Sequence, residues 1–493
     1  MSAGPESSEP SAESALGAST PHALRRVLVA RHVLALCFGA MIGWSWVVLA
    51  GSWVLEAGLA GATLALLVGG LGIVVIGLTY AELAAAIPLV GGEHAYSLRA
   101  LGPTASFVCT WAIVFGYLAV VAFEAVALPT AVEYLIPGFS VGPLWTIAGW
   151  QVEATWVLVG VLGAVAMTWI NVRGVQVAAE VQTWVVRLLV VSGAVLLVGA
   201  LLRPGASGPA PQFEVWSASG WGGVVSVLVM VPFMFVGFDV LPQAAEEVNL
   251  PPRRIGTLLV ASVLLAVLWY VCIGLAVGTS LDRAALEVSS SSGLPTVDAA
   301  GAAWAGIAGG GWAVVLLVVA GIAGVLTSWN AFLVGGSRAV FALAESGQLP
   351  AWFARLDERT GTPVNAVVFL GAFSALAPLF GRPALLWLVN AGGFGIVVAY
   401  AMVAISFLVL RWREPALERP FRAPTGSFVG WLALALSLGI MLLYLPGISP
   451  AALAWPAEWA LVLGWTLLGV VLYLVQARGA SPAVRAPDAG APR

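Results

Sequence analysis

The chain has 493 residues, of which 60% are hydrophobic and only 9% are charged, and its net charge is −3. A soluble domain has about a quarter of its residues charged, so this composition excludes a soluble globular protein and predicts one that lipid surrounds. The slight negative charge also excludes a nucleic-acid-binding protein, because such a protein needs a basic surface. The 3 cysteines and 3 histidines are not spaced as disulfide or zinc frames, so we predict no metal site and no cofactor.

Apolar stretches long enough to cross a bilayer recur along the chain, and they predict an all-α polytopic membrane protein with about twelve transmembrane helices. Residues 299–337 are expected to hold one span after a loop or short helix, and residues 423–457 one span followed by a loop. A further span, 181–202, is interrupted by Arg187. Because the apolar runs are continuous rather than alternating, strands are not expected. The remaining spans are 32–55, 57–81, 100–123, 154–172, 215–238, 255–281, 360–381, 383–410 and 459–477.

The arginines indicate how these spans are oriented. If the N-terminus is cytoplasmic, most arginines fall in cytoplasmic loops, and only Arg203, Arg283 and Arg382 fall in external ones. Such an excess predicts an even number of spans with both termini cytoplasmic, in the cell membrane. The terminal segments 1–30 and 478–493 are expected to be disordered tails.

Two spans contain residues that weaken a helix near the middle of the membrane. The first stretch is 39–46, Gly-Ala-Met-Ile-Gly-Trp-Ser-Trp, and the second is 232–239, Pro-Phe-Met-Phe-Val-Gly-Phe-Asp. Broken backbone in a membrane is tolerated only where it faces protein or a water-filled cavity. Paired breaks in corresponding positions of two halves, here 31–202 and 221–411, are typical of a transporter site. The alternative is that these glycines only allow close helix packing.

Four motifs follow one another along the chain. The first is the glycine-rich Gly39–Gly43, and the second is the segment from Tyr80 to Gly102, which contains the pair Gly91-Gly92. The third is the break Phe233–Asp239 together with residues 245–255, which begin with acidic residues and continue with Asn, Pro and Arg. The fourth is the segment from Ser337 to Ala366. In this order and spacing they resemble the amino acid–polyamine–organocation (APC) transporters, across residues 31–477.

The resemblance implies a LeuT-like core of five plus five helices in an inverted repeat, followed by two accessory helices in 423–477. It also implies a secondary active transporter that moves an amino acid or small organic amine by alternating access, and not an enzyme. We expect proton-coupled uptake, with substrate exchange or sodium-coupled symport as alternatives and a channel-like facilitator as a less favoured one. The expected partners are the small-molecule substrate, protons and the lipid bilayer.

The two breaks also predict where the substrate binds. Unwound backbone around Gly43 frees N–H groups at the start of a half-helix, which favours a carboxylate. Carbonyl groups freed near Phe233 would accept hydrogen bonds from an ammonium group. The indole of Trp44 would narrow the site, supply a cation–π face, or point into the bundle. The expected substrate contacts are Ile42, Gly43, Trp44, Ser45, Tyr117, Glu124, Phe233, Val236 and Gly237.

Several of these side chains have a second predicted role. The resemblance makes Phe233 the aromatic gate over the substrate, and an ordinary packed phenylalanine is the alternative. Glu124 lies within a span on the same helix face as Tyr117, where its carboxylate would favour a cationic substrate. Its alternative is an ion pair with Arg187. Asp239 follows the second break and is a candidate for proton coupling, or else a cap for nearby backbone donors.

Two more charged residues near the spans are candidates for coupling. Glu82 is interpreted as a gate or fold element rather than as a proton site. Arg187 would occupy the place of a sodium ion with a permanent positive charge, which argues against sodium coupling there. The alternative is an arginine that extends its head group toward the cytoplasmic surface. On the cytoplasmic side we expect ion pairs among Glu246, Glu247, Arg253 and Arg254.

Overall fold

The computed structural model describes residues 26–203 and 216–479. Of the predicted tails, all but 26–30 and 478–479 lie outside the described residues. The α-helices are α1 (Ala30–Met41), α2 (Ser45–Ala86), α3 (Glu93–Leu101), α4 (Pro103–Leu135), α5 (Ala154–Val172), α6 (Val175–Leu202), α7 (Trp221–Phe235), α8 (Val240–Gln243), α9 (Pro252–Ser280), α10 (Arg283–Ser292), α11 (Pro295–Trp304), α12 (Gly311–Glu345), α13 (Val364–Leu376), α14 (Ala384–Arg413), α15 (Ser427–Leu443) and α16 (Ala457–Gly479). The short 3₁₀ helices are η2 (Ala245–Glu247), η3 (Ala351–Ala354) and η4 (Ala377–Phe380), and the strands are β1 (Pro143–Ile147) and β2 (Trp150–Glu153).

Most of the described chain is helical, and 9 of the described helices are long and apolar enough to cross a membrane. Helix α2 has 42 residues. At about 1.5 Å per residue a straight helix of that length would be roughly twice as long as a bilayer core is thick. Gly58 resolves this mismatch, because its φ of 73° and ψ of 171° are not helical and divide α2 in two. The division falls at the boundary that the sequence predicts between the spans 32–55 and 57–81.

A short hairpin connects α4 to α5, so the prediction of a chain without strands is wrong at this loop. Strands β1 and β2 pair antiparallel, with Ile147 opposite Trp150. The turn residues Ala148 and Gly149 have φ values of 48° and 80°, and positive φ at both positions is what a tight hairpin turn requires. Continuous apolar runs argue against strands only within the spans, and this segment lies between two of them.

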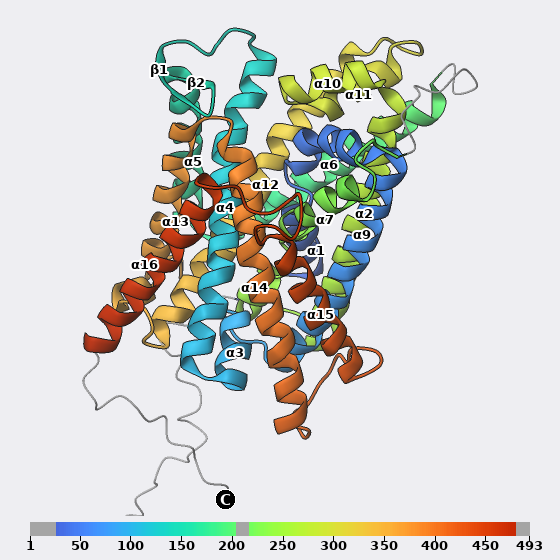
Figure 1. Cartoon of the computed structure of the whole chain (residues 1–493). Helices are drawn as coiled ribbons and strands as arrows, with labels where there is room; N and C mark the ends of the chain where they lie inside the picture. Colours follow the sequence, from blue (N-terminus) through green and yellow to red (C-terminus); the bar gives the residue numbers. More distant parts are fainter. Residues whose placement is uncertain (1–25, 204–215, 480–493) are drawn as a thin grey trace, which may run out of the picture.

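The helices stand side by side in one bundle with distinct ends (Figure 1). The hairpin and the short helices α10 and α11 lie at one end, while α3 and the loop after α14 lie at the other (Figure 1). Helix α4 is at the centre, since its middle turns are buried and it packs against both α12 and α14. Helix α1 also packs against α12 and α7 packs against α14, so the two helices that carry the predicted breaks lie in the middle of the bundle.

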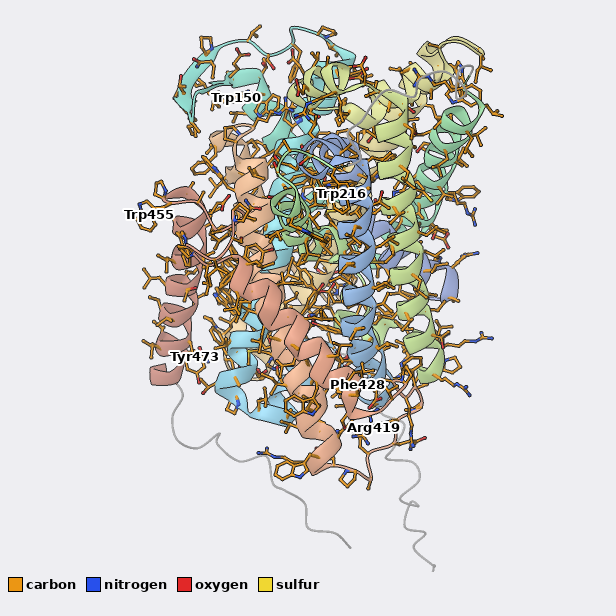
Figure 2. The ribbon with its side chains drawn as sticks, turned by 45° about the vertical axis from the view of Figure 1, so that its right-hand side comes forward. Trp150, Trp216, Arg419, Phe428, Trp455 and Tyr473 are labelled. Carbon is orange, nitrogen blue, oxygen red and sulfur yellow. The ribbon has the colours of Figure 1, made fainter. Side chains whose placement is uncertain are left out.

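The outer helices present apolar side chains to the surroundings. Leu158, Leu162, Val165 and Trp169 lie on one face of α5, and each is more than half exposed. Large exposed side chains also project outward at Trp455 and Phe428 (Figure 2). A helix face of this kind is stable only in an apolar environment, as lipid provides.

Candidate functional site

The structure interrupts two helices within the predicted stretches. Helix α1 ends at Met41 and α2 begins at Ser45, which leaves Ile42, Gly43 and Trp44 between them. Helix α7 ends at Phe235 and α8 begins at Val240. Each interruption leaves backbone N–H and C=O groups without partners inside their own helix.

The two breaks lie against each other. Gly237, in the second break, has a φ of 134°, a conformation that favours glycine. A Cβ atom there would be 2.7 Å from the Cβ of Ala40 and 2.9 Å from the nitrogen of Met41. Gly237 therefore lets the backbones of the two broken helices approach more closely than any other residue would.

One tyrosine from a third helix reaches both breaks. The hydroxyl of Tyr270, in α9, lies 2.5 Å from the carbonyl oxygen of Met41 and 2.9 Å from that of Met234. The hydroxyl of Ser45 is 2.8 Å from the same oxygen. Ser45 can donate to Tyr270 while Tyr270 donates to one carbonyl group, so a single hydroxyl group connects the freed ends of α1 and α7 with the start of α2.

Glu124 lies beside the first break. The hydroxyl of Ser328, in α12, donates a hydrogen bond to its Oε1 atom, and a Cβ atom on Gly43 would lie 3.2 Å from the same oxygen. The side chain is buried, and its Oε2 atom has no hydrogen-bond partner among the described residues. A buried oxygen of this kind is available to a substrate donor or a water molecule.

Asp239 supports the second break. Its Oδ1 atom accepts a hydrogen bond of 2.7 Å from the backbone N–H of Gly237. This is the capping geometry that was the alternative to proton coupling at this residue. The Oδ2 atom is buried and lacks a partner within 26–203 and 216–479, so the cap uses only half of the carboxyl group.

The predicted aromatic residues pack around the breaks. Trp44 is fully buried against Gly321 of α12, so its ring points into the bundle. Phe233 lies edge-on to Phe123 of α4, with ring centroids 5.5 Å apart. Tyr117 packs against the ring of Phe332, in α12. Ile42, Ser45 and Val236 are buried in the same region.

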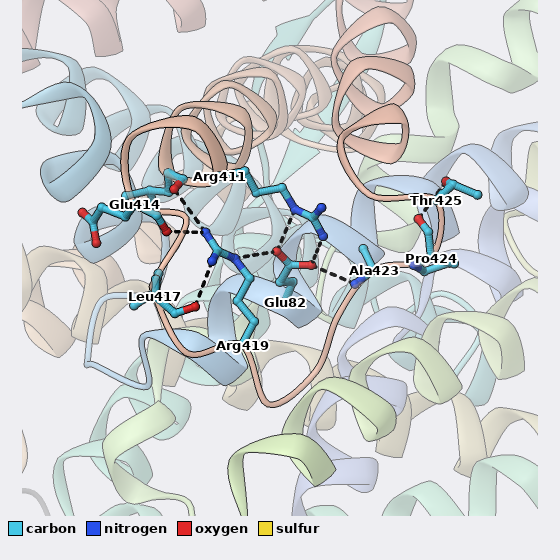
Figure 3. A network of polar contacts seen from close by, with 9 residues as sticks. Glu82, Arg411, Glu414, Leu417, Arg419, Ala423, Pro424 and Thr425 are labelled. Atoms are coloured by element: carbon cyan, nitrogen blue, oxygen red, sulfur yellow. Dashed lines mark hydrogen bonds and ion pairs between the residues drawn. The ribbon is translucent and has the colours of Figure 1, made fainter.

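Glu82 is held in an ion-pair network at the opposite end of α2 from the breaks. Its carboxylate is 2.5 Å from Arg411 and 3.1 Å from Arg419, and it accepts a hydrogen bond from the backbone of Ala423 (Figure 3). These partners connect α2 to the end of α14 and to the loop before α15. A carboxylate with two cations and a backbone donor is the geometry of a fold element, and not of a group that exchanges protons.

One expectation about cytoplasmic charges needs correction. Glu247 pairs with Arg338 of α12 at 2.9 Å, and the side chains are almost completely buried. Arg253 and Arg254 are exposed at the start of α9 and make no ion pair with Glu247 in the described part of the chain. The sequence suggested them as partners because they are near Glu247 in the chain, but packing brings in a residue from a distant helix instead.

Arg187 is on the outside of α6. Its guanidinium group stacks on the ring of Trp184, 4.5 Å from the ring centroid, and Trp184 is 66% exposed. The structure does not bring it to Glu124, whose carboxyl bonds to Ser328 instead. This is the position of an arginine that extends along the bundle surface.

Contacts at both ends close the bundle over the breaks. At the α3 end, the backbone N–H groups of Val27 and Leu28 donate to the carbonyl oxygen of Glu247 at 3.0 and 2.9 Å. At the other end, the hydroxyl of Thr296, in α11, donates to the carbonyl oxygen of Trp46 at 2.7 Å. The breaks are therefore closed from both sides in this conformation.

Sequence reasoning missed Tyr270 and Ser328. Each is a polar side chain within an otherwise apolar span, which is the signal that could have pointed to them. That signal does not indicate which helix face Tyr270 and Ser328 occupy.

Comparisons with known proteins agree with this architecture. The family model described as Amino acid permease matches residues 32–478. The branched-chain amino acid permease BcaP of Bacillus subtilis is 26% identical over 92% of this chain and 94% of its own length. The methylthioribose transporter of the same bacterium is 24% identical, over 93% of this chain and 95% of its own length. Its aspartate-proton symporter is 26% identical, over 81% of this chain and 76% of its own length. Since the family match spans nearly all of the sequence, the chain belongs to the amino acid permease family of APC transporters, which are multi-pass membrane proteins.

Proposed function

We propose that the chain is a secondary active transporter that takes up an amino acid or small organic amine together with protons, across the cytoplasmic membrane. The observation that carries the proposal is the pair of buried helix breaks, which lie against each other and share the hydroxyl of Tyr270. Backbone groups at such breaks bind both ends of a zwitterion without needing a charged side chain at each end.

The substrate is proposed to lie between the two breaks. The N-terminus of α2 favours negative charge, whether of a substrate carboxylate or of Glu124, whose carboxyl lies beside Gly43. The open Oε2 atom of Glu124 is placed to accept a hydrogen bond from a substrate ammonium group. Phe233 is proposed as the gate on the opposite wall, where it packs against Phe123.

Protons are the proposed coupling ion. Glu124 and Asp239 are buried carboxyl groups beside the breaks, and each has one oxygen atom without a partner among the described residues. Glu82 is excluded from this role by its two arginines. We assign Arg187 no part in coupling, so it no longer argues against sodium. A relative named as an aspartate-proton symporter supports protons as the first choice.

The proposed topology has twelve spans with both termini cytoplasmic. In it, α1 crosses the membrane together with the part of α2 before Gly58, and α7 crosses together with α8. The part of α2 after Gly58 makes a second span, and the short apolar helices α13 and α15 complete the set of 12 that the sequence predicts. Residues 31–202 and 221–411 would then form the two inverted repeats, each with a break in its first helix.

The test is uptake into proteoliposomes that contain the full chain. The probes are a ¹⁴C-labelled mixture of the protein amino acids and, separately, ¹⁴C-putrescine, each with and without an inward proton gradient. We expect accumulation of label that a protonophore abolishes. The same assay with Glu124→Gln tests whether this carboxyl contacts the substrate.

Each outcome of this assay supports or contradicts one part of the proposal. Uptake that the gradient drives in the wild-type protein, and that falls at least tenfold in Glu124→Gln, supports both the function and the role of Glu124. Gradient-driven uptake that survives in the variant removes Glu124 from the mechanism. Uptake that requires only internal substrate indicates an exchanger, and dependence on sodium indicates a sodium symporter. Either would overturn proton coupling.

A further inference from the structure

Another buried carboxyl group lies outside the residues that the proposed mechanism uses. Glu93 begins α3, in the connection between α2 and α4, and its side chain is completely buried. The Nε2 atom of Gln243, the last residue of α8, donates a hydrogen bond to its Oε2 atom. The backbone N–H of Gly91 donates to the carbonyl oxygen of Gln243 over 3.2 Å. The loop that carries Glu93 is therefore docked on α8, the half-helix that follows the second break.

Glu93 has no cationic partner in the part of the chain that the structure describes. No ion pair joins it to an arginine, and its Oε1 atom has no hydrogen-bond donor within 26–203 and 216–479. A charged carboxylate that is buried without a cation is strongly disfavoured. Burial raises the pKa of the Glu93 carboxyl well above its ordinary value, and the negative charge of Asp239 raises it further. While α8 is docked, the protonated form of Glu93 is favoured.

Several buried polar groups interact electrostatically with this carboxyl group. The hydroxyl groups of four buried tyrosines and the Oε1 atom of Gln243 lack hydrogen-bond partners among the described residues. Buried polar atoms of this kind are normally satisfied by ordered water, so the cluster has the composition of a hydrated path. The titratable groups that face Glu93 are Tyr80 of α2, Tyr96 of α3, Cys109 and Tyr117 of α4, Asp239 before α8, and Tyr400 of α14.

We propose that Glu93 binds the coupled proton on its way to the cytoplasm and receives it from Asp239 through water held by these tyrosines. The inference rests on the proposed proton-coupled function. In the transfer, one O–H bond breaks on Asp239 and one forms on the Glu93 carboxylate, so the total charge of the cluster does not change. In the following step the Glu93 O–H bond breaks and the proton passes to cytoplasmic water.

The docking of α8 determines when Glu93 releases its proton. A cavity of about 440 Å³ lies at this end of the bundle, and its walls include Val90, three residues before Glu93, and His94, the residue after it. When the inner side opens, α8 moves away from the loop and water from this cavity reaches the carboxyl group. Hydration stabilises the charged form, and Glu93 loses its proton to the cytoplasm.

The experiment compares two transport modes in proteoliposomes that contain the full chain, with the ¹⁴C-labelled amino acid mixture as probe. Counterflow without a gradient measures binding and translocation, while accumulation driven by an inward proton gradient measures coupling. We expect Glu93→Gln, which resembles the protonated form, to keep counterflow within twofold and to lose gradient-driven accumulation at least tenfold. Glu345→Gln is the matched control, because Glu345 is an exposed carboxylate in the wall of the same cavity, and it should change neither mode.

Two results would overturn the inference. The first is gradient-driven accumulation in Glu93→Gln that equals the wild-type level, and the second is loss of both modes in a variant that elutes and melts like the wild-type protein. If Glu93→Gln does not fold, Gln243→Leu provides the test instead. The dependence of uptake on internal pH must shift in this variant if Glu93 carries the proton. Failure of the proposed function is seen separately, as a wild-type protein with counterflow but no response to the gradient, and it would remove the coupling role of Glu93 as well.

Discussion

Glu82 and Glu93 are two buried carboxyl groups near the same end of the bundle, and they differ in what surrounds them. Glu82 has Arg411, Arg419 and a backbone N–H within hydrogen-bond distance. Glu93 has the amide of Gln243 and no arginine among its described contacts. The first arrangement fixes a charge and holds three segments together. The second leaves a group whose charge can change when a half-helix moves, so the surroundings of a buried carboxyl group, rather than its burial, separate a structural role from a proton-binding role.

The largest expected effect of this difference is on stability. Glu82→Gln leaves Arg411 and Arg419 without their carboxylate, and breaking a buried ion pair in this way costs about 3–5 kcal/mol. Glu93→Gln keeps the shape of the side chain and removes no ion pair, so its cost should be below ~1 kcal/mol. Thermal unfolding of both variants in detergent measures the contrast. Equal losses in the two variants would contradict it.

The next effect concerns transport. Tyr270→Phe removes the hydroxyl that connects Met41, Met234 and Ser45 at the breaks. We expect gradient-driven uptake of the labelled amino acids to fall about tenfold, since one hydrogen bond in a binding site is worth roughly 1–1.5 kcal/mol. Tyr473→Phe is the control. Tyr473 lies in α16, away from the breaks, so this variant should retain wild-type uptake. Normal uptake in Tyr270→Phe would mean that the breaks do not form the site.

A smaller effect, on the dependence of uptake on internal pH, distinguishes Glu93 from Glu82. The hydrogen bond from Gln243 favours the charged form of Glu93 and lowers the pKa of its carboxyl, so Gln243→Leu should raise that pKa. Release of the proton then requires a more alkaline interior. The dependence of uptake on internal pH should shift upward by roughly one unit, which corresponds to about 1.4 kcal/mol. An unchanged profile, or a shift toward acid, would contradict the assignment.

The smallest effect is expected at Arg187. Its guanidinium group lies on Trp184 at the bundle surface, away from the breaks. Arg187→Gln should therefore leave both counterflow and gradient-driven uptake within twofold of the wild-type values. A loss of coupling in this variant would contradict this expectation. It would support the role that the sequence suggested, in which Arg187 occupies the place of a sodium ion.

Much of the fold could be predicted because it depends on local composition. Apolar length predicted the helices that are long and apolar enough to cross a membrane. Gly43 and Gly237 marked the breaks, since a helix weakens where glycine and proline gather. The hairpin at Ala148-Gly149 was missed because it lies in a loop, where the rule for spans does not apply.

Side-chain partners could not be predicted in the same way, because they depend on the packing of distant helices. Sequence proximity suggested Arg253 for Glu247, but Arg338 is the partner. Glu93 lies in a connection between two predicted spans, and only the docking of α8 on this connection shows that its side chain is buried.

The most direct test of proton-coupled uptake uses proteoliposomes that contain the full chain and the pH-sensitive dye pyranine. The labelled amino acid mixture is added outside, with the membrane potential held at zero. Coupled uptake predicts that the interior becomes more acidic as label enters, at a rate that falls with Glu93→Gln. Entry of label with no change in internal pH would contradict the account.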